Sequence, residues 1–308
     1  MHILVIGARG LIARHLRRWL LQRGHTLTTI TRCAKLSAMG PEEELLTWHC
    51  IAKRGLPPCD ALVSLTGAPI ASKRWTRRTK QEHLATRVGV IHRIEILMRA
   101  MPRPPKRAVI ATAVGIYPAT PTCTWDEQPP LIAPERGDQS QFLRWLGHQW
   151  EAAAQTLETH CPVTCLRLGA VLATDGGMID KLSPWFRKGL GIGFGEGTNP
   201  FPWIHIRDAC QIATFALETD VAGPINCVAP DLVDLKTFIQ SLAGAFGKRV
   251  LCRISPRWLR WLLGERAALL LEGPRVCPKR LTSLNYSYAF PRLKTALAEC
   301  CGIATTSI

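Results

Sequence analysis

The chain has 308 residues, 47% of them hydrophobic, and this length can bury a large core in one large domain or in two unequal ones. Its 39 Lys and Arg outnumber its 23 Asp and Glu and give a formal net charge of +16. No apolar run reaches the roughly 18 residues that a transmembrane helix needs, and no signal-peptide pattern precedes the first strand. We therefore expect a cytoplasmic protein with no membrane partner.

The 12 cysteines are scattered, and only Cys300 and Cys301 are close together in the sequence. No C-x-x-C pair and no His/Cys cluster has the spacing of a zinc site. We therefore expect reduced and mostly buried thiols, no disulfide framework and no metal.

The N-terminus predicts a strand, a glycine turn and a helix. His2 to Ile6 is a short apolar run, and apolar residues from Leu11 to Arg23 recur at helical spacing. A glycine turn before a helix lets backbone N–H groups approach a pyrophosphate. The residues expected to face it are Gly7, Gly10, Leu11 and Ile12. Because the third glycine of the usual pattern is replaced by Ala13, an ordinary turn without a ligand is the alternative.

The second predicted strand, Thr26 to Thr31, is rich in β-branched residues and leads directly into Arg32. An NAD-binding fold usually places an acidic residue near this point, on the ribose. An arginine suits a 2′-phosphate instead, and Arg9 adds a second cation near it. The sequence therefore predicts that NADP(H) is the cofactor.

The chain then continues to alternate between strands and helices. The further predicted strands are Asp60–Thr66, Ala108–Ala113, Val163–Leu168 and Pro224–Val228, and the long helices are Thr76–Met101 and Gln139–His160. Near-continuous apolar strands are typical of a parallel sheet that is covered on both faces. We therefore predict an α/β fold, a Rossmann-type doubly wound parallel sheet. Gly7, Thr66 and Thr112 lie at the carboxyl ends of its strands, where such sheets bind ligands.

The composition changes after Leu168. Residues 176–177 and 189–197 are glycine-rich and predict flexible loops, and helices dominate from about Leu235. We therefore predict an NADP-binding domain at residues 1–230, with substrate-side loops at 176–204. Residues 231–308 form the predicted smaller and mostly helical C-terminal region.

Two basic clusters contribute to the net charge. The first comprises Arg14, Arg17, Arg18 and Arg23, and the second comprises Lys73, Arg74, Arg77, Arg78 and Lys80. They could attract an anionic partner, or they could be solvated helix faces. Because the chain has no nucleic-acid-binding motif, we favour solvated faces and expect no nucleic-acid partner.

Several motifs, in order, carry a resemblance to a known family. They are Leu65-Thr66-Gly67-Ala68-Pro69, Thr86-Arg87-Val88, Thr112-Ala113-Val114-Gly115-Ile116-Tyr117, Trp150-Glu151-Ala152, Leu166-Arg167-Leu168-Gly169, Trp203-Ile204-His205-Ile206-Arg207-Asp208 and Leu271 to Arg280. The chain resembles the extended short-chain dehydrogenase/reductases over nearly its whole length. It is most similar to the atypical, NAD-dependent epimerase/dehydratase-like subgroup with its characteristic C-terminal domain.

The resemblance implies hydride transfer with a nicotinamide, supported by a Tyr-x-x-x-Lys pair on the helix after the fifth strand. The pair is missing here, because its positions fall near Leu143 and Gly147. Thr112 matches the residue that polarises the substrate oxygen. Tyr117 is the best substitute for the tyrosine, with a lid residue as the alternative. His148 is a weaker candidate, since a lone helical histidine is more often structural.

The resemblance also assigns binding positions. Thr66, Gly67 and Ala68 are expected beside the adenosine ribose, and Leu168 with Gly169 beside the nicotinamide. Arg87 either contacts the cofactor or forms a salt bridge on its helix face. Trp203 and His205 either touch a substrate or anchor their loop, and Asp208 is expected to cap the helix that follows.

Two functions remain open at this level. The first is an NADP(H)-dependent oxidoreductase or epimerase-like enzyme that acts on a small metabolite. The second is a non-catalytic NADP(H)-binding redox sensor or regulatory protein. Relatives of this kind often pair through long helices, so a homodimer is a further expectation.

Overall fold

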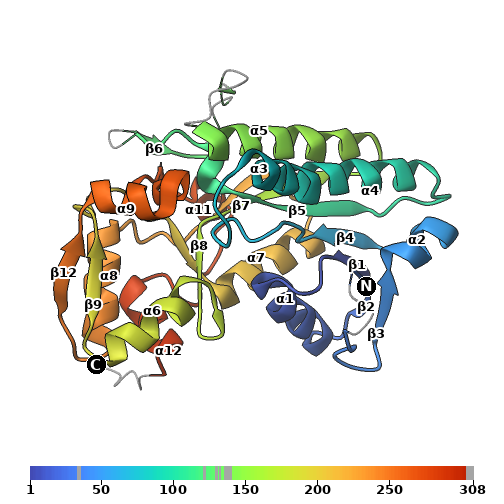
Figure 1. Cartoon of the computed structure of the whole chain (residues 1–308). Helices are drawn as coiled ribbons and strands as arrows, with labels where there is room; N and C mark the ends of the chain where they lie inside the picture. Colours follow the sequence, from blue (N-terminus) through green and yellow to red (C-terminus); the bar gives the residue numbers. More distant parts are fainter. Residues whose placement is uncertain (33–35, 121–122, 129–130, 132, 135–140, 303–308) are drawn as a thin grey trace.

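A seven-stranded, all-parallel sheet forms the centre of the molecule (Figure 1). The computed structural model describes residues 1–32, 36–120, 123–128, 131, 133–134 and 141–302. The strand order is β11-β7-β5-β4-β1-β2-β3. The strands are β1 (His2–Ile6), β2 (Thr26–Thr31), β3 (Glu43–Thr47), β4 (Ala61–Ser64), β5 (Arg107–Ala113), β7 (Val163–Leu168) and β11 (Gly223–Cys227). The order reverses at β1, as in a doubly wound fold, and so confirms the predicted fold class.

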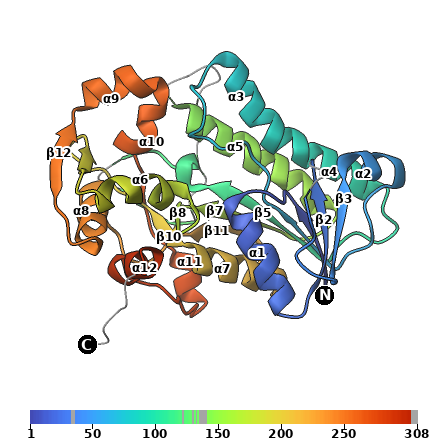
Figure 2. The same ribbon diagram turned by 60° about the horizontal axis from the view of Figure 1, so that its bottom comes forward.

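Alternate residues of the strands serve two separate cores. Ile3 and Val5 of β1 pack in the core on the side of α1 (Leu11–Gln22) and α7 (Ile206–Glu218). Leu4 and Ile6 face the opposite core, which is built with α4 (Val90–Arg99) and α5 (Phe142–Gln155). Figure 2 shows the two helical layers on either side of the sheet. All four side chains are fully buried, which explains why the strand reads as an apolar run.

The long helix predicted for Thr76–Met101 is three consecutive segments. They are α3 (Arg77–Leu84), a π-helical turn (Ala85–Gly89) and α4 (Val90–Arg99). The Thr76 hydroxyl accepts a hydrogen bond from the backbone N–H of Thr79 and so caps the N-terminus. The helix predicted from Gln139 begins at Phe142, and Gln139 itself lies outside the described residues. The π turn contains Arg87, and such turns often occur at functional positions.

Strand β3 and helix α2 (Trp48–Arg54) were not predicted, and the prediction for part of the glycine-rich segment was wrong. Gly191–Phe194 is not a flexible loop but a strand, β9, which pairs in parallel with β12 (Val250–Ile254). A Cβ atom at Gly191 would lie 2.6 Å from the carbonyl oxygen of Arg249. The glycine therefore permits close strand pairing at this point.

The remaining elements form a smaller lobe beside the carboxyl ends of the sheet strands (Figures 1 and 2). Its elements are β8 (Ala170–Ala173), α6 (Gly177–Arg187), β10 (Trp203–His205), α8 (Leu235–Ala245), α9 (Pro256–Leu263), α10 (Ala268–Leu271), β13 (Arg275–Val276), α11 (Lys279–Ser283) and α12 (Leu293–Cys300). β13 pairs with β6 (Thr124–Trp125). Among the described residues, no helix is long and apolar enough to span a bilayer. The predicted domain boundary at residue 230 stays a prediction.

Candidate nucleotide-binding site

The turn between β1 and α1 has the geometry of an anion-binding loop. Gly7 adopts φ +96°, and a Cβ atom there would lie 3.0 Å from the carbonyl group of Leu65, so only glycine fits without strain. Gly10 is the exposed N-cap of α1, and no side chain caps the helix. A Cβ atom at Gly10 would meet nothing within 4 Å. The first N–H groups of a 12-residue helix are thus open to an anion.

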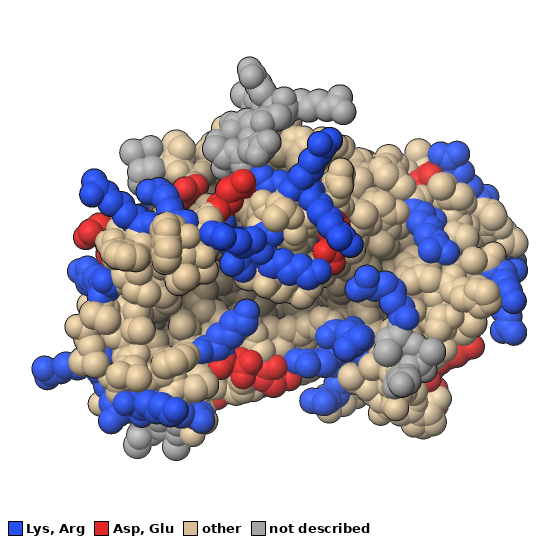
Figure 3. Space-filling model, in the orientation of Figure 1, with Lys and Arg blue, Asp and Glu red and all other residues tan. Residues whose placement is uncertain are grey.

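Two cations flank this turn. Arg9 and Arg32 are exposed, and neither forms a hydrogen bond or an ion pair with the residues that the structure describes. The pKa of the Glu82 carboxyl group on α3 is lowered chiefly by the hydrogen bond between Glu82 and Lys73. Arg32 lies near Glu82, because its positive charge also contributes to lowering this pKa. Lys and Arg side chains border the hollow across this face of the molecule (Figure 3). The contacts of Arg9 and Arg32 with a 2′-phosphate stay a prediction.

Arg17 of α1 is not a surface cation. Its side chain is fully buried and forms two hydrogen bonds with the carboxylate of Glu43, at 2.6 and 2.7 Å. Arg17 also donates to the carbonyl oxygen of Ala8 within the turn, and Glu43 accepts from Thr29 and from the backbone of Met39. Both sequence-based interpretations of Arg17 are therefore wrong, because this residue fixes the turn against β2 and β3.

The electrostatics of Glu43 follow from that arrangement. Burial raises the pKa of the Glu43 carboxyl group. The hydrogen bonds from Arg17, Thr29 and the backbone of Met39, together with the charge of Arg17, lower this pKa and outweigh the effect of burial. The pair was missed because β3, which carries Glu43, was not predicted. A bidentate arginine–carboxylate contact of this kind gives the nucleotide turn a rigid support.

Arg87 holds the loop that follows β4 in place. The guanidinium donates to the carbonyl oxygen of Ala68 at 2.9 Å and lies 5.0 Å from the ring of Trp150. Gly67 makes room for it, since a Cβ atom there would lie 2.9 Å from the guanidinium. Burial lowers the pKa of Arg87 to about 10. The alternative of a salt bridge on the helix face is wrong, because no described carboxylate pairs with Arg87. Thr66 is half-buried beside the same loop.

Thr112 belongs to a buried polar network beneath the site. Its hydroxyl donates to Glu151 Oε1 at 3.2 Å, and Glu151 accepts two further hydrogen bonds from Arg167, at 2.8 and 2.7 Å. Arg167 also donates to the hydroxyl of Tyr117 at 2.6 Å and lies 5.0 Å from the tyrosine ring. Three motifs that are far apart in sequence thus meet as one network.

Tyr117 is therefore a poor candidate for proton transfer. Its side chain is 2% exposed, and its hydroxyl contacts Asn226 Oδ1 at 2.7 Å and the carbonyl oxygen of Asp126 at 2.9 Å. Burial raises the pKa of Tyr117 to about 12 against the opposing charge of Arg167. The predicted acid–base role of Tyr117 is not supported, because its proton is held by acceptors inside the protein. Thr112 is likewise committed to Glu151.

The network extends into the C-terminal region. Glu127 accepts hydrogen bonds from the backbone N–H groups of Asn226 and Arg280, at 3.0 and 3.2 Å. Asn226 donates to the carbonyl oxygen of Cys277, and Lys279 pairs with Asp126 at 2.7 Å. These contacts dock the segment from Cys277 to Arg280 on the end of the sheet. The C-terminal motif therefore helps to hold Asp126, Glu127 and Asn226 in place beneath the predicted site.

Packing accounts for the residues that stand at the Tyr-x-x-x-Lys positions. A Cβ atom at Gly147 would lie 2.8 Å from the Cβ of Ile116. Helix α5 therefore packs too closely on the turn after β5 to accommodate a lysine at this position. Leu143 is half-buried in the cluster around Trp75 and Phe142. The chain has three tyrosines, and none of them is followed by lysine four residues later.

His148 lies one residue beyond the lysine position. Its Nε2 is buried and has no hydrogen-bond partner among the described residues. Burial lowers the pKa of this imidazole, Arg144 and Arg167 lower it further, and Glu151 opposes them. This environment therefore favours the neutral form of the side chain. A buried nitrogen without a partner is costly unless something else satisfies it.

The segment after β7 is anchored rather than open. A Cβ atom at Gly169 would lie 2.8 Å from the carbonyl oxygen of Pro202, and Leu168 is partly buried against the core. Trp203 is fully buried and donates to the carbonyl oxygen of Asp231 at 3.0 Å. His205 is 1% exposed. Of the two alternatives for Trp203 and His205, the geometry supports anchoring.

His205, not Asp208, caps α7. The His205 Nδ1 accepts from the N–H of Arg207 at 3.2 Å, and Nε2 lies 2.8 Å from Glu299. The carboxylate of Asp208 instead accepts from the backbone N–H groups of Ala289 and Phe290, at 2.7 and 2.9 Å. The prediction was wrong because α7 begins at Ile206, three residues earlier than the expected start at Ala209.

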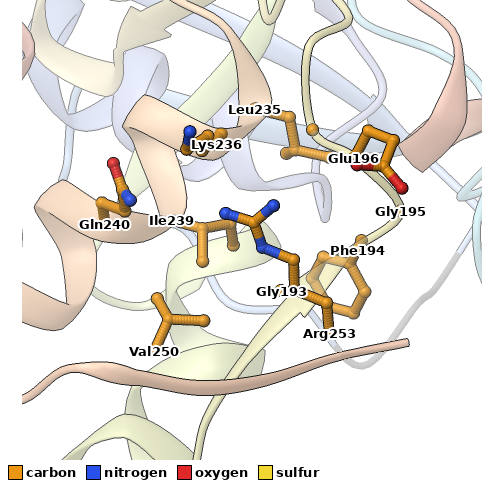
Figure 4. A pocket seen from close by; sticks show the side chains of 11 residues that line it. Gly193, Phe194, Gly195, Glu196, Leu235, Lys236, Ile239, Gln240, Val250 and Arg253 are labelled. Carbon is orange, nitrogen blue, oxygen red and sulfur yellow. The ribbon is translucent and has the colours of Figure 1, made fainter. Parts of the chain in front are cut away.

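A small pocket lies elsewhere, between β9, α8 and β12 (Figure 4). Phe194, Lys236, Ile239 and Arg253 are among its lining residues, and none of the predicted cofactor or catalytic residues lines it. The arginine extends from β12 toward Ile239 of α8. This pocket therefore does not contribute to the nucleotide site.

The glycine turn at the switch point of a doubly wound sheet defines a Rossmann-type, nucleotide-binding class of protein. Within this class, the model of the NAD dependent epimerase/dehydratase family matches residues 3–228, and a domain of unknown function (DUF1731) matches residues 256–300. The chain belongs to the NAD dependent epimerase/dehydratase family. The resemblance inferred from its motifs is thereby confirmed.

Individual relatives agree with this assignment. The human epimerase family protein SDR39U1 is 35% identical over 303 residues, covering 97% of this chain and 99% of the relative. A crystal structure of that human protein with NADPH has a TM-score of 0.88 and covers 98% and 99% of the two chains. UDP-glucuronic acid 4-epimerase from Bacillus cereus has a TM-score of 0.75, covers 98% of each chain, and at 16% identity shares only the fold.

Proposed function

We propose that this chain binds NADP(H) at the carboxyl edge of its sheet. The observation that carries the proposal is the N-terminus of α1 behind the Gly7 turn, which no side chain caps. It is flanked by Arg9 and Arg32, which are exposed and have no ion-pair partner among the described residues. A helix N-terminus favours a pyrophosphate, and an exposed guanidinium favours a phosphate monoester. A homologue of known structure was solved with NADPH, which supports the same cofactor here. When bound, such a cofactor supplies or accepts a hydride.

We further propose that the Tyr–Lys route of proton transfer does not operate in this protein. The hydroxyls of Thr112 and Tyr117 donate hydrogen bonds to acceptors inside the protein. Gly147 packs so closely on Ile116 that a lysine side chain has no room at this position. NADP(H) binding without rapid turnover, in a sensing or regulatory role, is the function that this geometry supports best.

An oxidoreductase acting on a small metabolite is the second candidate, and His148 favours it. Its buried Nε2 has no hydrogen-bond partner among the described residues, and such a nitrogen could exchange a proton with a ligand. If so, His148→Gln would abolish NADPH oxidation with carbonyl substrates while NADPH binding, measured by calorimetry, stays within about twofold. Wild-type protein that shows no oxidation across such a panel would favour the binding role.

The specificity for the phosphorylated cofactor tests the primary proposal. Arg32→Ala removes a charge-assisted phosphate contact worth about 1.5–3 kcal/mol, so NADP binding should weaken roughly tenfold or more while NAD binding hardly changes. Arg18→Ala is the matched control, since Arg18 is also exposed but lies farther along α1. Equal losses for NADP and NAD in the Arg32 variant would contradict the assignment.

A further inference from the structure

The surface of α9 (Pro256–Leu263) is unusually apolar. Leu259 is its buried residue, at 2% exposure, whereas Trp258, Trp261 and Leu262 are 63%, 70% and 59% exposed. Positions 258, 261 and 262 lie on one face at helical spacing. The two indole rings are 5.6 Å apart, edge to face. Large apolar side chains grouped in this way indicate an interaction surface.

Positive charge accompanies this surface. From Leu235 to Gly264 the sequence has six Lys and Arg and no acidic residue. Arg257 and Arg260 of α9 are exposed and form no hydrogen bond or ion pair with described residues. Figures 1 and 2 place α9 and β12 at the outer edge of the smaller lobe, away from β1, β2 and β3. The basic apolar face is thus separate from the turn between β1 and α1.

We propose that α9 docks this protein peripherally on an anionic lipid surface. Tryptophan prefers the boundary between headgroups and acyl chains, and arginine binds anionic headgroups. The proposal replaces the expectation of no membrane partner, which rested on the missing spanning helix. It requires only that the helix lie in the plane of the interface.

Other occupants fit this surface less well. A symmetric dimer through α9 would bring Arg257 and Arg260 of the two copies together, and like charges would oppose it. A nucleic acid would satisfy Arg257 and Arg260 but would leave the aliphatic chain of Leu262 without a partner. An anionic bilayer satisfies both the charges and the apolar groups.

The helix is held rigidly enough to act as a docking element. The Ser255 hydroxyl caps its N-terminus. Arg74 donates to the carbonyl oxygen of Trp261 at 3.2 Å, and Arg266 donates to that of Ala71 at 3.0 Å. Lys80 also pairs with Glu265 at 2.6 Å. These contacts join the end of α9 to the segment that follows the Gly67–Ala68 loop.

Co-sedimentation with vesicles tests the proposal. We expect the full chain to bind vesicles of phosphatidylcholine mixed equally with phosphatidylglycerol, and to bind phosphatidylcholine alone at least tenfold more weakly. A double variant, Trp258→Ser with Trp261→Ser, and a second, Arg257→Gln with Arg260→Gln, should each lose roughly tenfold or more in binding to the mixed vesicles. Tryptophan emission should shift to the blue on binding, and the serine variant should lose that shift.

Two controls isolate the surface. Ile96→Ser removes an equally exposed apolar side chain, 63% exposed, from α4, and Lys53→Gln with Arg54→Gln removes two positive charges from α2. Both should bind like the wild type. Thermal unfolding should be nearly unchanged in all four variants, because the altered side chains are exposed.

Three results would overturn the proposal. The first is no binding to the mixed vesicles, or equal losses in the control variants. The second is a dimer in sedimentation velocity that the serine variant dissociates. The third is binding to a DNA duplex that depends on Arg257 and Arg260, without binding to vesicles.

Discussion

Arg17 has a structural role, in a buried pair with Glu43, that its position among other basic residues in the sequence does not reveal. In sequence, Arg17 is one of four basic residues on a helix. In the fold it crosses to β3 and contacts the carbonyl oxygen of Ala8 in the nucleotide turn. A fully buried charge of this kind depends on its partner, because each ion alone would be strongly disfavoured.

Removing one member of this pair should therefore be costly. Glu43→Gln leaves Arg17 buried without its counter-charge, and we expect about 3 kcal/mol less stability in urea unfolding. Glu44→Gln, at the exposed neighbouring position, should change stability by less than about 0.5 kcal/mol. A loss below about 1 kcal/mol for the Glu43 variant would show that the pair contributes little.

The same pair predicts a pH dependence. Folding lowers the pKa of Glu43 below its ordinary value of 4.5, so the folded chain binds this proton less readily than the unfolded chain. The stabilisation is fully present above pH 4.5 and is lost as the pH falls through the lower, folded pKa. Unfolding curves of the wild type and the Glu43 variant should converge as the solution is acidified through that range. Curves that stay parallel would contradict this origin.

At the scale of elements, close packing of α5 on the turn after β5 decides what the site can do. Gly147 permits the contact with Ile116, and the Thr112–Glu151–Arg167 network locks the same helix to the sheet. The positions of the missing Tyr-x-x-x-Lys pair are therefore closely packed: Leu143 contacts an apolar cluster, and Gly147 contacts Ile116.

A lysine introduced at position 147 should destabilise the fold. Gly147→Lys places a Cβ atom 2.8 Å from Ile116, and overpacking should cost about 1–3 kcal/mol in thermal or urea unfolding. Gly244→Ala is the matched control, because a Cβ atom in this part of α8 meets nothing within 4 Å. We expect it to leave stability unchanged or raise it by up to about 1 kcal/mol. A lysine variant as stable as the wild type would refute the packing argument.

For the whole molecule, the sequence predicts the sheet well because its strands are buried on both faces and read as apolar runs. Most of the predicted strands lie within a residue or two of the observed bounds. β3 was missed because Glu43–Thr47 is half polar, and β9 because four glycines stand close together in residues 189–195. Their pairing depends on partners distant in the chain, which local patterns do not report.

The candidate site was predictable in part. The glycine turn and Arg32 are local signals, and their positions at the strand ends follow from the fold. The contacts of Tyr117 with Arg167 and Asn226 join residues up to 109 positions apart, so the sequence could not reveal that this hydroxyl is held inside the protein. The hydrogen bond from the backbone N–H of Arg280 to Glu127 joins residues 153 positions apart, so the sequence could not reveal it either.

The cofactor preference can be measured by calorimetric titration of NADP, NADPH, NAD and NADH into the purified chain, at low and high salt. We expect NADP and NADPH to bind at least tenfold more tightly than NAD and NADH. This preference should be smaller at high salt, because exposed arginines cause it. Binding of none of the four, or equal binding of all four, would contradict it.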